Sequence, residues 1–161
     1  MTKVATCLWF DGQAEEAARL YTSLIPDSRI NRVDTAAGDN PSTQKGDVLT
    51  VDFTVGGHDL IGLNGGPEFQ FNESMSLSVL CEDQAEVDRL WSSLILGGGE
   101  PSQCGWLKDK FGVSWQIVPK VLPEMLASPD RDAAERAMQA MLGMTKLDIR
   151  QLTEAYEGVP A

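Results

Sequence analysis

The chain has 161 residues, of which 42% are hydrophobic, and its formal net charge is −11. This length suits one domain or two small modules with a shared core, and the hydrophobic share is ample for a buried core. The negative charge argues against phosphate backbones and anionic membrane surfaces as partners. We therefore expect no nucleic-acid or membrane partner, whereas neutral or cationic small ligands are compatible with this charge.

The amino terminus leads directly into the β-compatible segment Val4–Phe10. We expect no secretory signal before it and find no apolar run long enough to span a bilayer, which predicts a cytoplasmic protein. Cys7, Cys81 and Cys104 are an odd number of cysteines, all in predicted strands, and none belongs to a C-x-x-C pair. This pattern predicts three reduced core thiols rather than a disulfide framework or a zinc site.

The pattern of the first half predicts one helix among four strands. Ala17, Leu20 and Leu24 recur at helical spacing, and Pro26 follows as a stop signal. Gly56-Gly57 between two alternating segments predicts a hairpin turn. The predicted elements are a strand at Val4–Phe10, a helix at Gln13–Leu24, an edge strand at Ser28–Thr35, a polar loop at Ala36–Asp47, and strands at Val48–Val55 and His58–Asn64.

The second half repeats this order of elements. Gln13-Ala14-Glu15 recurs as Gln84-Ala85-Glu86, and Arg19–Leu24 recurs as Arg89–Leu94 with one residue fewer between the two blocks. A repeat of this length predicts two similar modules whose sheets join side by side. The predicted elements are a strand at Ser74–Cys81, a helix at Asp83–Leu96, a strand at Gln103–Leu107, a turn at Lys108–Gly112 and a strand at Val113–Val118.

A helical extension follows the second module. Ser128-Pro129-Asp130 is a helix-start signal, and an apolar stripe ends at Gly143. We expect this stripe to pack against the sheet or another subunit; its members are Ala134, Ala137, Met138, Met141 and Leu142. Thr145, with Asp148 three residues on, predicts the cap of a short helix through Tyr156. The predicted fold is α+β: a single domain (1–161) with βαβββ modules at 3–66 and 73–119 and helices within 120–157.

Three segments carry a family resemblance: LWFDGQAEEAARLYTSLIP (8–26), LNGGPEFQFNE (63–73) and QCGWLKDKFGVSWQIVP (103–119). They resemble the PhnB-like family, often labelled 3-demethylubiquinone 3-methyltransferase-like, over about Val4–Leu142. The duplicated module resembles the wider vicinal oxygen chelate superfamily, which includes glyoxalases, ring-cleaving dioxygenases and bleomycin resistance proteins. The resemblance implies two modules with curved mixed sheets around a ligand cavity, and frequently a homodimer.

Metal-dependent members of that superfamily place one metal ligand on the first strand and one on the last strand of each module. The anchors that match the two modules are Phe10 with Cys81 and Gly57 with Gly112. The resemblance then puts the four ligand positions at Ala5, Ile61, Ser76 and Gln116. Alanine and isoleucine have no donor atom, serine is a poor ligand, and one glutamine cannot hold an ion alone. We therefore expect no metal at these positions, and a metal enzyme remains the alternative if this alignment is wrong.

Two further features bear on cofactors and catalysis. Asn64-Gly65-Gly66-Pro67 lies between strands and is followed by no helix, so it does not have the form of a turn that cradles a nucleotide cofactor. We expect no cofactor. The sole histidine, His58, is three residues from Ile61 and so points to the opposite face of a regular strand. We expect a histidine at the surface or beside the turn, with a catalytic base as the alternative.

Alternate residues of a strand share one face, and this parity predicts a pocket. Several small or hydroxyl residues on an interior face are unusual for a filled core and indicate a cavity with Trp9 and Trp106 as walls. Water or a partner's side chain filling the space is the alternative. Asn64, Asn72 and Glu73 could reach the rim, with turn chemistry as the other role of Asn64. The predicted pocket residues are Cys7, Trp9, Ile61, Asn64, Ser76, Ser78, Trp106, Ser114 and Gln116.

The sequence thus predicts a protein that binds a small molecule in a concave cavity without the superfamily's metal site. Two alternatives stay open: a metal-dependent lyase, isomerase or dioxygenase, and a protein that sequesters an antibiotic, for which the acidic balance would suit a cationic guest. The pattern identifies no acid–base pair, so the catalytic residues are unknown. The loop Ala36–Asp47 is either a lid or a mobile connection.

Overall fold

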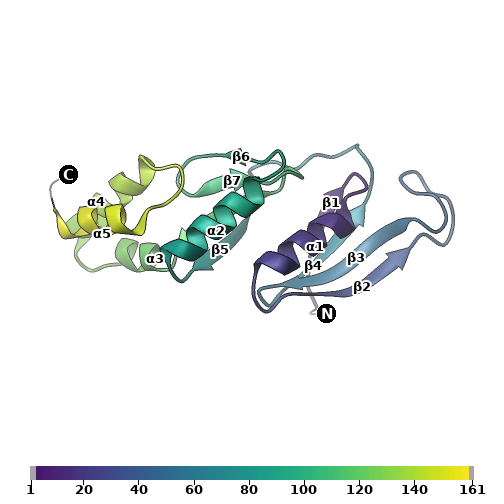
Figure 1. Ribbon diagram of the computed structural model, residues 1–161, viewed down its shortest axis with the longest axis horizontal. Helices are drawn as coiled ribbons and strands as arrows, with labels where there is room; N and C mark the ends of the chain where they lie inside the picture. The colour runs from purple at the N-terminus through teal and green to yellow at the C-terminus, as the bar shows by residue number, and fades with distance from the viewer. Residues whose placement is uncertain (1–2, 160–161) are drawn as a thin grey trace. The chain divides into compact units, whose positions relative to one another are not determined.

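A computed structural model describes residues 3–159 (Figure 1). The prediction that no secretory signal precedes the first strand involves Met1 and Thr2, which are outside the described residues. The chain divides between Phe71 and Asn72 into two compact units, each of which is described by itself below. Among residues 3–159, every helix is too short or too polar to cross a membrane.

The first unit is a four-stranded sheet with one helix. Its elements are β1 (Thr6–Phe10), α1 (Ala14–Leu24), β2 (Arg29–Thr35), β3 (Val48–Val55) and β4 (His58–Asn64). The strand order is β1-β4-β3-β2, in which β1 runs parallel to β4 and the other pairs are antiparallel. The predicted order of elements and the edge position of β2 are confirmed. The first strand, however, begins at Thr6, and Val4 is exposed ahead of it.

Helix α1 lies along one face of this sheet (Figure 1) because apolar residues alternate along the strands. Leu8, Phe53 and Leu60 are buried on the helix-covered face. Gly62 lets the helix approach closely, since a side-chain Cβ at this position would lie 3.1 Å from the Cβ of Ala14. The predicted Gly56-Gly57 turn joins β3 to β4, and both glycines have positive φ, as a tight hairpin requires.

The second unit repeats the module and adds three helices. Its elements are β5 (Leu77–Cys81), α2 (Gln84–Ile95), β6 (Glu100–Pro101), β7 (Trp106–Lys108), β8 (Ser114–Pro119), α3 (Val121–Leu126), α4 (Arg131–Leu142) and α5 (Ile149–Glu157). The strand order is β5-β8-β7-β6, which matches the order of the first sheet. Asp83 caps α2 by accepting a hydrogen bond from the Glu86 backbone N–H, and α2 covers one face of the sheet.

The predicted strand Gln103–Leu107 is wrong in its first half. Cys104 has a φ of 57° and Gly105 a φ of 83°, and these left-handed conformations interrupt an extended strand. Their backbone N–H groups donate to the carbonyls of Met144 and Thr145 instead of to a neighbouring strand. Strand β7 therefore starts at Trp106, and the short edge strand β6 was not predicted.

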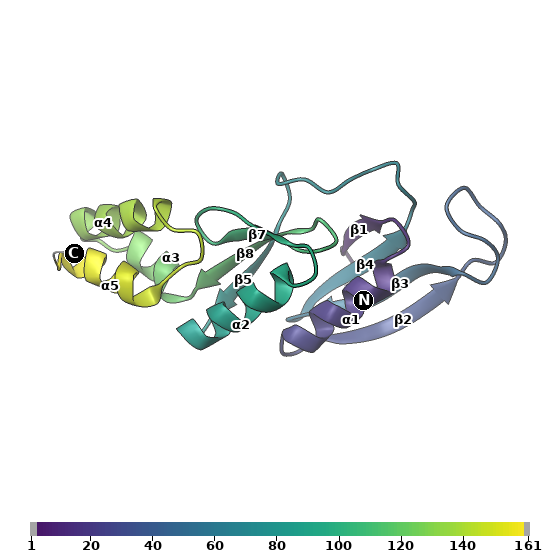
Figure 2. The same ribbon diagram turned by 45° about the horizontal axis from the view of Figure 1, so that its top comes forward.

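The three C-terminal helices gather beyond the end of the second sheet (Figures 1 and 2). They share a small apolar core of Leu122, Met125, Ala137, Leu147 and Leu152. Helix α5 is capped by Asp148, which accepts from the Gln151 N–H, rather than by the predicted Thr145. The predicted apolar stripe is only partly buried, because Met138 and Leu142 are 39% and 51% exposed.

The three cysteines occupy three different environments, which corrects the prediction of three core thiols in strands. All three are free within the described residues. Cys7 is exposed, and Cys104 lies in the loop before β7. Cys81 is buried, and its desolvation raises its pKa to about 12.

The strand registers fix which residues of the two units are equivalent. Phe10 pairs with Asn64 at the end of β1, and Cys81 pairs with Pro119 at the end of β5. Counting back from these pairs makes Ile61 the counterpart of Gln116, as the sequence anchors predicted. By the same count, Asp59 corresponds to Ser114, Thr54 to Lys108, and Trp9 to Leu80.

Candidate functional site

Each sheet has a face opposite its helix, which we call the open face. In the first unit Cys7, Trp9 and Ile61 lie on it, because they alternate with residues that are buried beneath α1. In the second unit the same alternation puts four predicted pocket residues on the open face. These are Ser78, Trp106, Ser114 and Gln116, with Ser76 just ahead of β5. The predicted pocket residues therefore form two sets, one in each unit.

In the first unit the open face is partly covered by the unit's own chain at Trp9. The Trp9 Nε1–H donates to the Gly66 carbonyl at 2.8 Å, and the indole meets Phe69 edge-on with 5.0 Å between ring centroids. A Cβ on Gly65 would lie 2.3 Å from the indole, so this position needs glycine. The segment that gave the LNGGPEF resemblance therefore packs onto Trp9.

Asn64 lies on the helix-covered face, so the open face does not include it. Its Oδ1 accepts a hydrogen bond from the first backbone N–H of α1, at Ala14, and its Nδ2–H donates to the Val48 carbonyl, both at 2.9 Å. The Ser42 hydroxyl donates to the Asn64 carbonyl at 2.8 Å. These bonds tie together β4, the start of the helix and the loop Ala36–Asp47, and they leave the amide engaged in the fold.

In the second unit Gln116 and Ser76, which were both predicted to line the pocket, form a hydrogen bond with each other. The Gln116 Nε2–H donates to the Ser76 Oγ at 2.9 Å. Trp106 is the cross-strand partner of Gln116 on β7. This contact supplies the half-buried amide with a partner, and Trp106 lines the cavity described next.

A cavity of about 430 Å³ opens in the second unit. Its lining consists of Glu73, Glu100, Pro101, Ser102, Gln103, Cys104, Trp106, Leu107, Lys108 and Ser114. Ser114 is only 2% exposed, and within residues 3–159 its hydroxyl has no hydrogen-bond partner. Leaving a buried hydroxyl unpaired costs about 1–3 kcal/mol. Such a group at the wall of a cavity is a candidate contact for a bound molecule.

An ion pair and a second carboxylate give this cavity its charge. The Lys108 ammonium lies 2.5 Å from the Glu73 carboxylate. This hydrogen bond lowers the pKa of Glu73 and raises that of Lys108, which the nearby Glu100 charge raises further. Glu73 was predicted near the rim. Lys108 was missed because it was assigned to the turn, although it shares strand parity with Trp106.

Other residues with predicted roles have local structural partners. Asn72 Oδ1 accepts from the Ser74 backbone N–H at 2.9 Å and from its hydroxyl, which makes a turn. His58 is exposed and its Nε2 lies 3.1 Å from the Thr6 hydroxyl, as expected for a histidine beside a turn. The loop 36–47 is closed by the backbone bond from Ala36 N–H to the Asp47 carbonyl.

The four positions that correspond to metal ligands in the superfamily do not suit a divalent ion. Ala5 and Ile61 offer no donor atom, Ser76 offers only a hydroxyl, and Gln116 offers only a neutral amide oxygen. Within residues 3–159, no three His, Cys, Asp or Glu side chains gather as a metal site would require. The donor set therefore does not fit the superfamily's metal.

Comparisons with known proteins identify relatives of the chain. A family described as 3-demethylubiquinone-9 3-methyltransferase matches residues 2–118. A structure titled putative 3-demethylubiquinone-9 3-methyltransferase, PhnB protein, from Bacillus cereus is 34% identical, with a TM-score of 0.64 over 71% of this chain and 97% of that one. Protein PA1353 from Pseudomonas aeruginosa is 21% identical, with a TM-score of 0.52 over 71% and 95% of the chains. No curated protein matches the chain.

The family match also corrects the extent of the resemblance. It ends at residue 118, at the end of the second module, rather than near Leu142. Helices α3, α4 and α5 lie beyond it. The two modules are therefore the part of the chain that its family defines.

Proposed function

Since this chain belongs to the PhnB-like family, described as 3-demethylubiquinone-9 3-methyltransferase, we propose that it binds a small molecule. The site is the cavity on the open face of the second unit. The observation that carries the proposal is the buried Ser114 hydroxyl at the cavity wall, which has no partner among the described residues. Trp106 supplies an apolar wall, and Gln116 with Ser76 supplies polar groups on the same face.

The test is a nuclear magnetic resonance titration of the ¹⁵N-labelled protein with a library of aromatic fragments. Binding compounds should shift the Trp106 indole signal and the backbone signals of Ser114 and Gln116. Trp106→Ala should weaken these compounds about tenfold, because it removes a wall of the cavity. Gln70→Ala, at an exposed position of the first unit, is the control and should change nothing. Fragments that shift signals only elsewhere in the chain would refute this placement of the site.

We further propose that binding needs no metal at the superfamily's four positions. The donor set at Ala5, Ile61, Ser76 and Gln116 supports this, because two of the four side chains cannot coordinate. Elemental analysis of protein purified without chelators should find less than stoichiometric metal. Calorimetric titration with nickel, zinc and manganese should show no tight binding. One tightly bound ion per chain would overturn the proposal and revive a metal enzyme.

The family resemblance also supports a homodimer, which we propose as the state in solution. Strands β1 and β5 are end strands of their sheets, so each presents backbone groups along one edge that a second chain could pair with. Light scattering after size-exclusion chromatography should give twice the chain mass of 17.5 kDa. A mass of one chain at all concentrations would exclude the dimer.

A cytoplasmic location is proposed on the free state of the three described cysteines.

A further inference from the structure

Equivalent positions on the two open faces satisfy their polar groups differently. In the first unit the Thr54 hydroxyl donates to Asp59 Oδ1 at 2.8 Å and accepts from Asn31 Nδ2–H at 2.9 Å. The counterparts of Asp59 and Thr54 in the second unit are Ser114 and Lys108. Lys108 binds Glu73 instead, and the Ser114 hydroxyl is left without a partner among residues 3–159.

The charged lining of the cavity favours one class of ligand for the Ser114 hydroxyl. Two carboxylates, Glu73 and Glu100, face one ammonium, Lys108, so the lining carries a net charge of −1 by this count. The pair of carboxylates already stabilises the Lys108 ammonium, since the hydrogen bond to Glu73 and the charge of Glu100 raise its pKa. An anionic ligand would have to displace Glu73 from Lys108 while facing Glu100, which is electrostatically unfavourable.

The uncharged lining adds a flat apolar surface. Trp106 and Pro101 line the same cavity, and an indole is the aromatic side chain that attracts cations most strongly. A volume of about 430 Å³ has room for a compound with one aromatic ring. The net negative charge, the flat apolar surface and the unpaired Ser114 hydroxyl are thus three separate features of one cavity lining.

We propose that the cavity binds a small organic amine with a planar body and a second polar group. The ammonium shares the carboxylates of Glu73 and Glu100 with Lys108, which stays bonded to one oxygen of Glu73. The ring lies against Trp106, and the polar group bonds to the Ser114 hydroxyl. This inference rests on the proposed function, because it names the ligand class for that same cavity. Ser114 is then a residue that selects ligands and adds little to the stability of the free protein.

Four matched compounds test the proposal: tyramine, tyrosol, 4-hydroxyphenylacetate and phenethylamine. Tyramine, tyrosol and 4-hydroxyphenylacetate share a phenol ring and differ in charge, whereas phenethylamine is tyramine without the hydroxyl. Dissociation constants follow from the shift of the Trp106 indole signal. Tyramine should bind about tenfold more tightly than tyrosol, and 4-hydroxyphenylacetate should bind more weakly still. Raising the salt concentration should weaken tyramine and leave tyrosol nearly unchanged.

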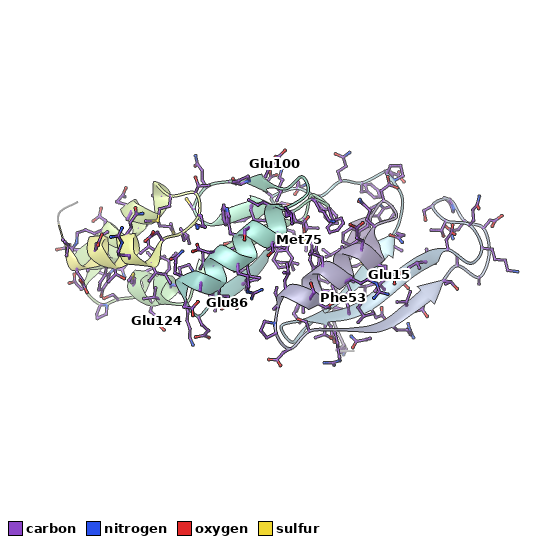
Figure 3. All side chains as sticks on the ribbon, in the orientation of Figure 1. Glu15, Phe53, Met75, Glu86, Glu100 and Glu124 are labelled. Carbon is purple, nitrogen blue, oxygen red and sulfur yellow. The ribbon has the colours of Figure 1, made fainter. Side chains whose placement is uncertain are left out.

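Two variants separate the charge from the hydroxyl. Glu100→Gln should weaken tyramine about threefold and leave tyrosol unchanged, since it removes one carboxylate near the ammonium. Glu124→Gln is the matched control, because Glu124 lies on α3 outside the cavity lining while Glu100 lies on β6 (Figure 3). Ser114→Ala should weaken tyramine about fivefold without affecting phenethylamine.

Each result has a distinct consequence. If tyrosol or 4-hydroxyphenylacetate binds as tightly as tyramine, the preference for a cation is wrong, while binding at the cavity stands. If Ser114→Ala affects tyramine and phenethylamine equally, the role of Ser114 is wrong. If none of the four compounds shifts the Trp106 signal, the amine class is refuted. The fragment titration then decides independently whether the cavity binds other molecules.

Discussion

The two units share one backbone plan but use their open faces differently. In the first unit, the chain from Gly65 to Phe69 packs onto Trp9, and Asp59 has a partner in Thr54. In the second unit, Leu80 stands at the position of Trp9 and is 58% exposed. The comparison teaches that a duplicated module can use one copy's open face for its own packing while the equivalent position in the other copy stays exposed.

The units also differ in how they turn the last hairpin. In the first, Gly56 and Gly57 supply positive φ, and the Ser28 hydroxyl accepts a hydrogen bond from the Gly56 backbone N–H at 2.9 Å. In the second, the buried Asp109 accepts hydrogen bonds from the backbone N–H groups of Phe111 and Val113, and from the Trp115 indole at 2.9 Å. A buried carboxylate therefore organises the turn that sets the register of β7 and β8 beside the cavity.

The largest expected effect comes from breaking that turn. Asp109→Ala would leave three donors without their acceptor, two of them buried, and should lower the free energy of unfolding by about 3 kcal/mol. Urea denaturation followed by circular dichroism measures this loss. Asp39→Ala is the matched control, since exposed Asp39 accepts one backbone bond from Lys45, and it should cost less than about 1 kcal/mol. Equal losses for the two variants would show that Asp109 does not organise the turn.

A smaller effect separates the two open faces directly. Thr54→Val removes two hydrogen bonds from the first unit and should lower the free energy of unfolding by about 1–2 kcal/mol. Ser114→Ala removes no bond observed among the described residues, so it should leave stability within about 0.5 kcal/mol or raise it. The same urea experiment measures both variants. A loss from Ser114→Ala as large as that from Thr54→Val would mean that the hydroxyl has a structural partner, and would weaken the case for a ligand.

Much of the fold could be predicted from the sequence because it depends on local patterns. Alternation fixed the strands of the first unit, and the repeat of Gln13–Leu24 in Gln84–Leu94 fixed the position of the second helix. The break at Cys104 was not accessible, because a cysteine gives no signal for positive φ. It depends on the backbone carbonyls of Met144 and Thr145, which lie far along the chain and accept from the N–H groups of Cys104 and Gly105.

The candidate site could be predicted only in part, because some of its residues are placed by side-chain contacts that a local sequence pattern does not reveal. Strand parity put Ser114 and Gln116 on one face, whereas the position of Trp106 beside Gln116 comes from the register of β7 and β8. The same parity, applied to the three-residue step from Ile61, would have put Asn64 on the other face. The role of Lys108 depends on where the strand ends. The three bonds accepted by Asp109 shorten the turn and place Lys108 in β7, and a sequence pattern does not reveal such side-chain bonds in advance.

The smallest effect concerns the thiols, and it compares an open face with a helix-covered one. Cys7 is exposed on the first open face, whereas Cys81 is buried under α2. Iodoacetamide should therefore label Cys7 in the native protein and reach Cys81 only after unfolding, as peptide mass spectrometry would show.

Partial burial raises the pKa of Cys7 above its ordinary value of 9.0, so less thiolate is present near neutral pH. The rate at which iodoacetamide labels Cys7 should therefore still be rising above pH 9.0. Cys7→Ser should remove this label and change stability by less than about 0.5 kcal/mol. Equal labelling of Cys7 and Cys81 in the native protein would show that the second unit opens beneath α2, and that its helix-covered face is no better closed than its open one.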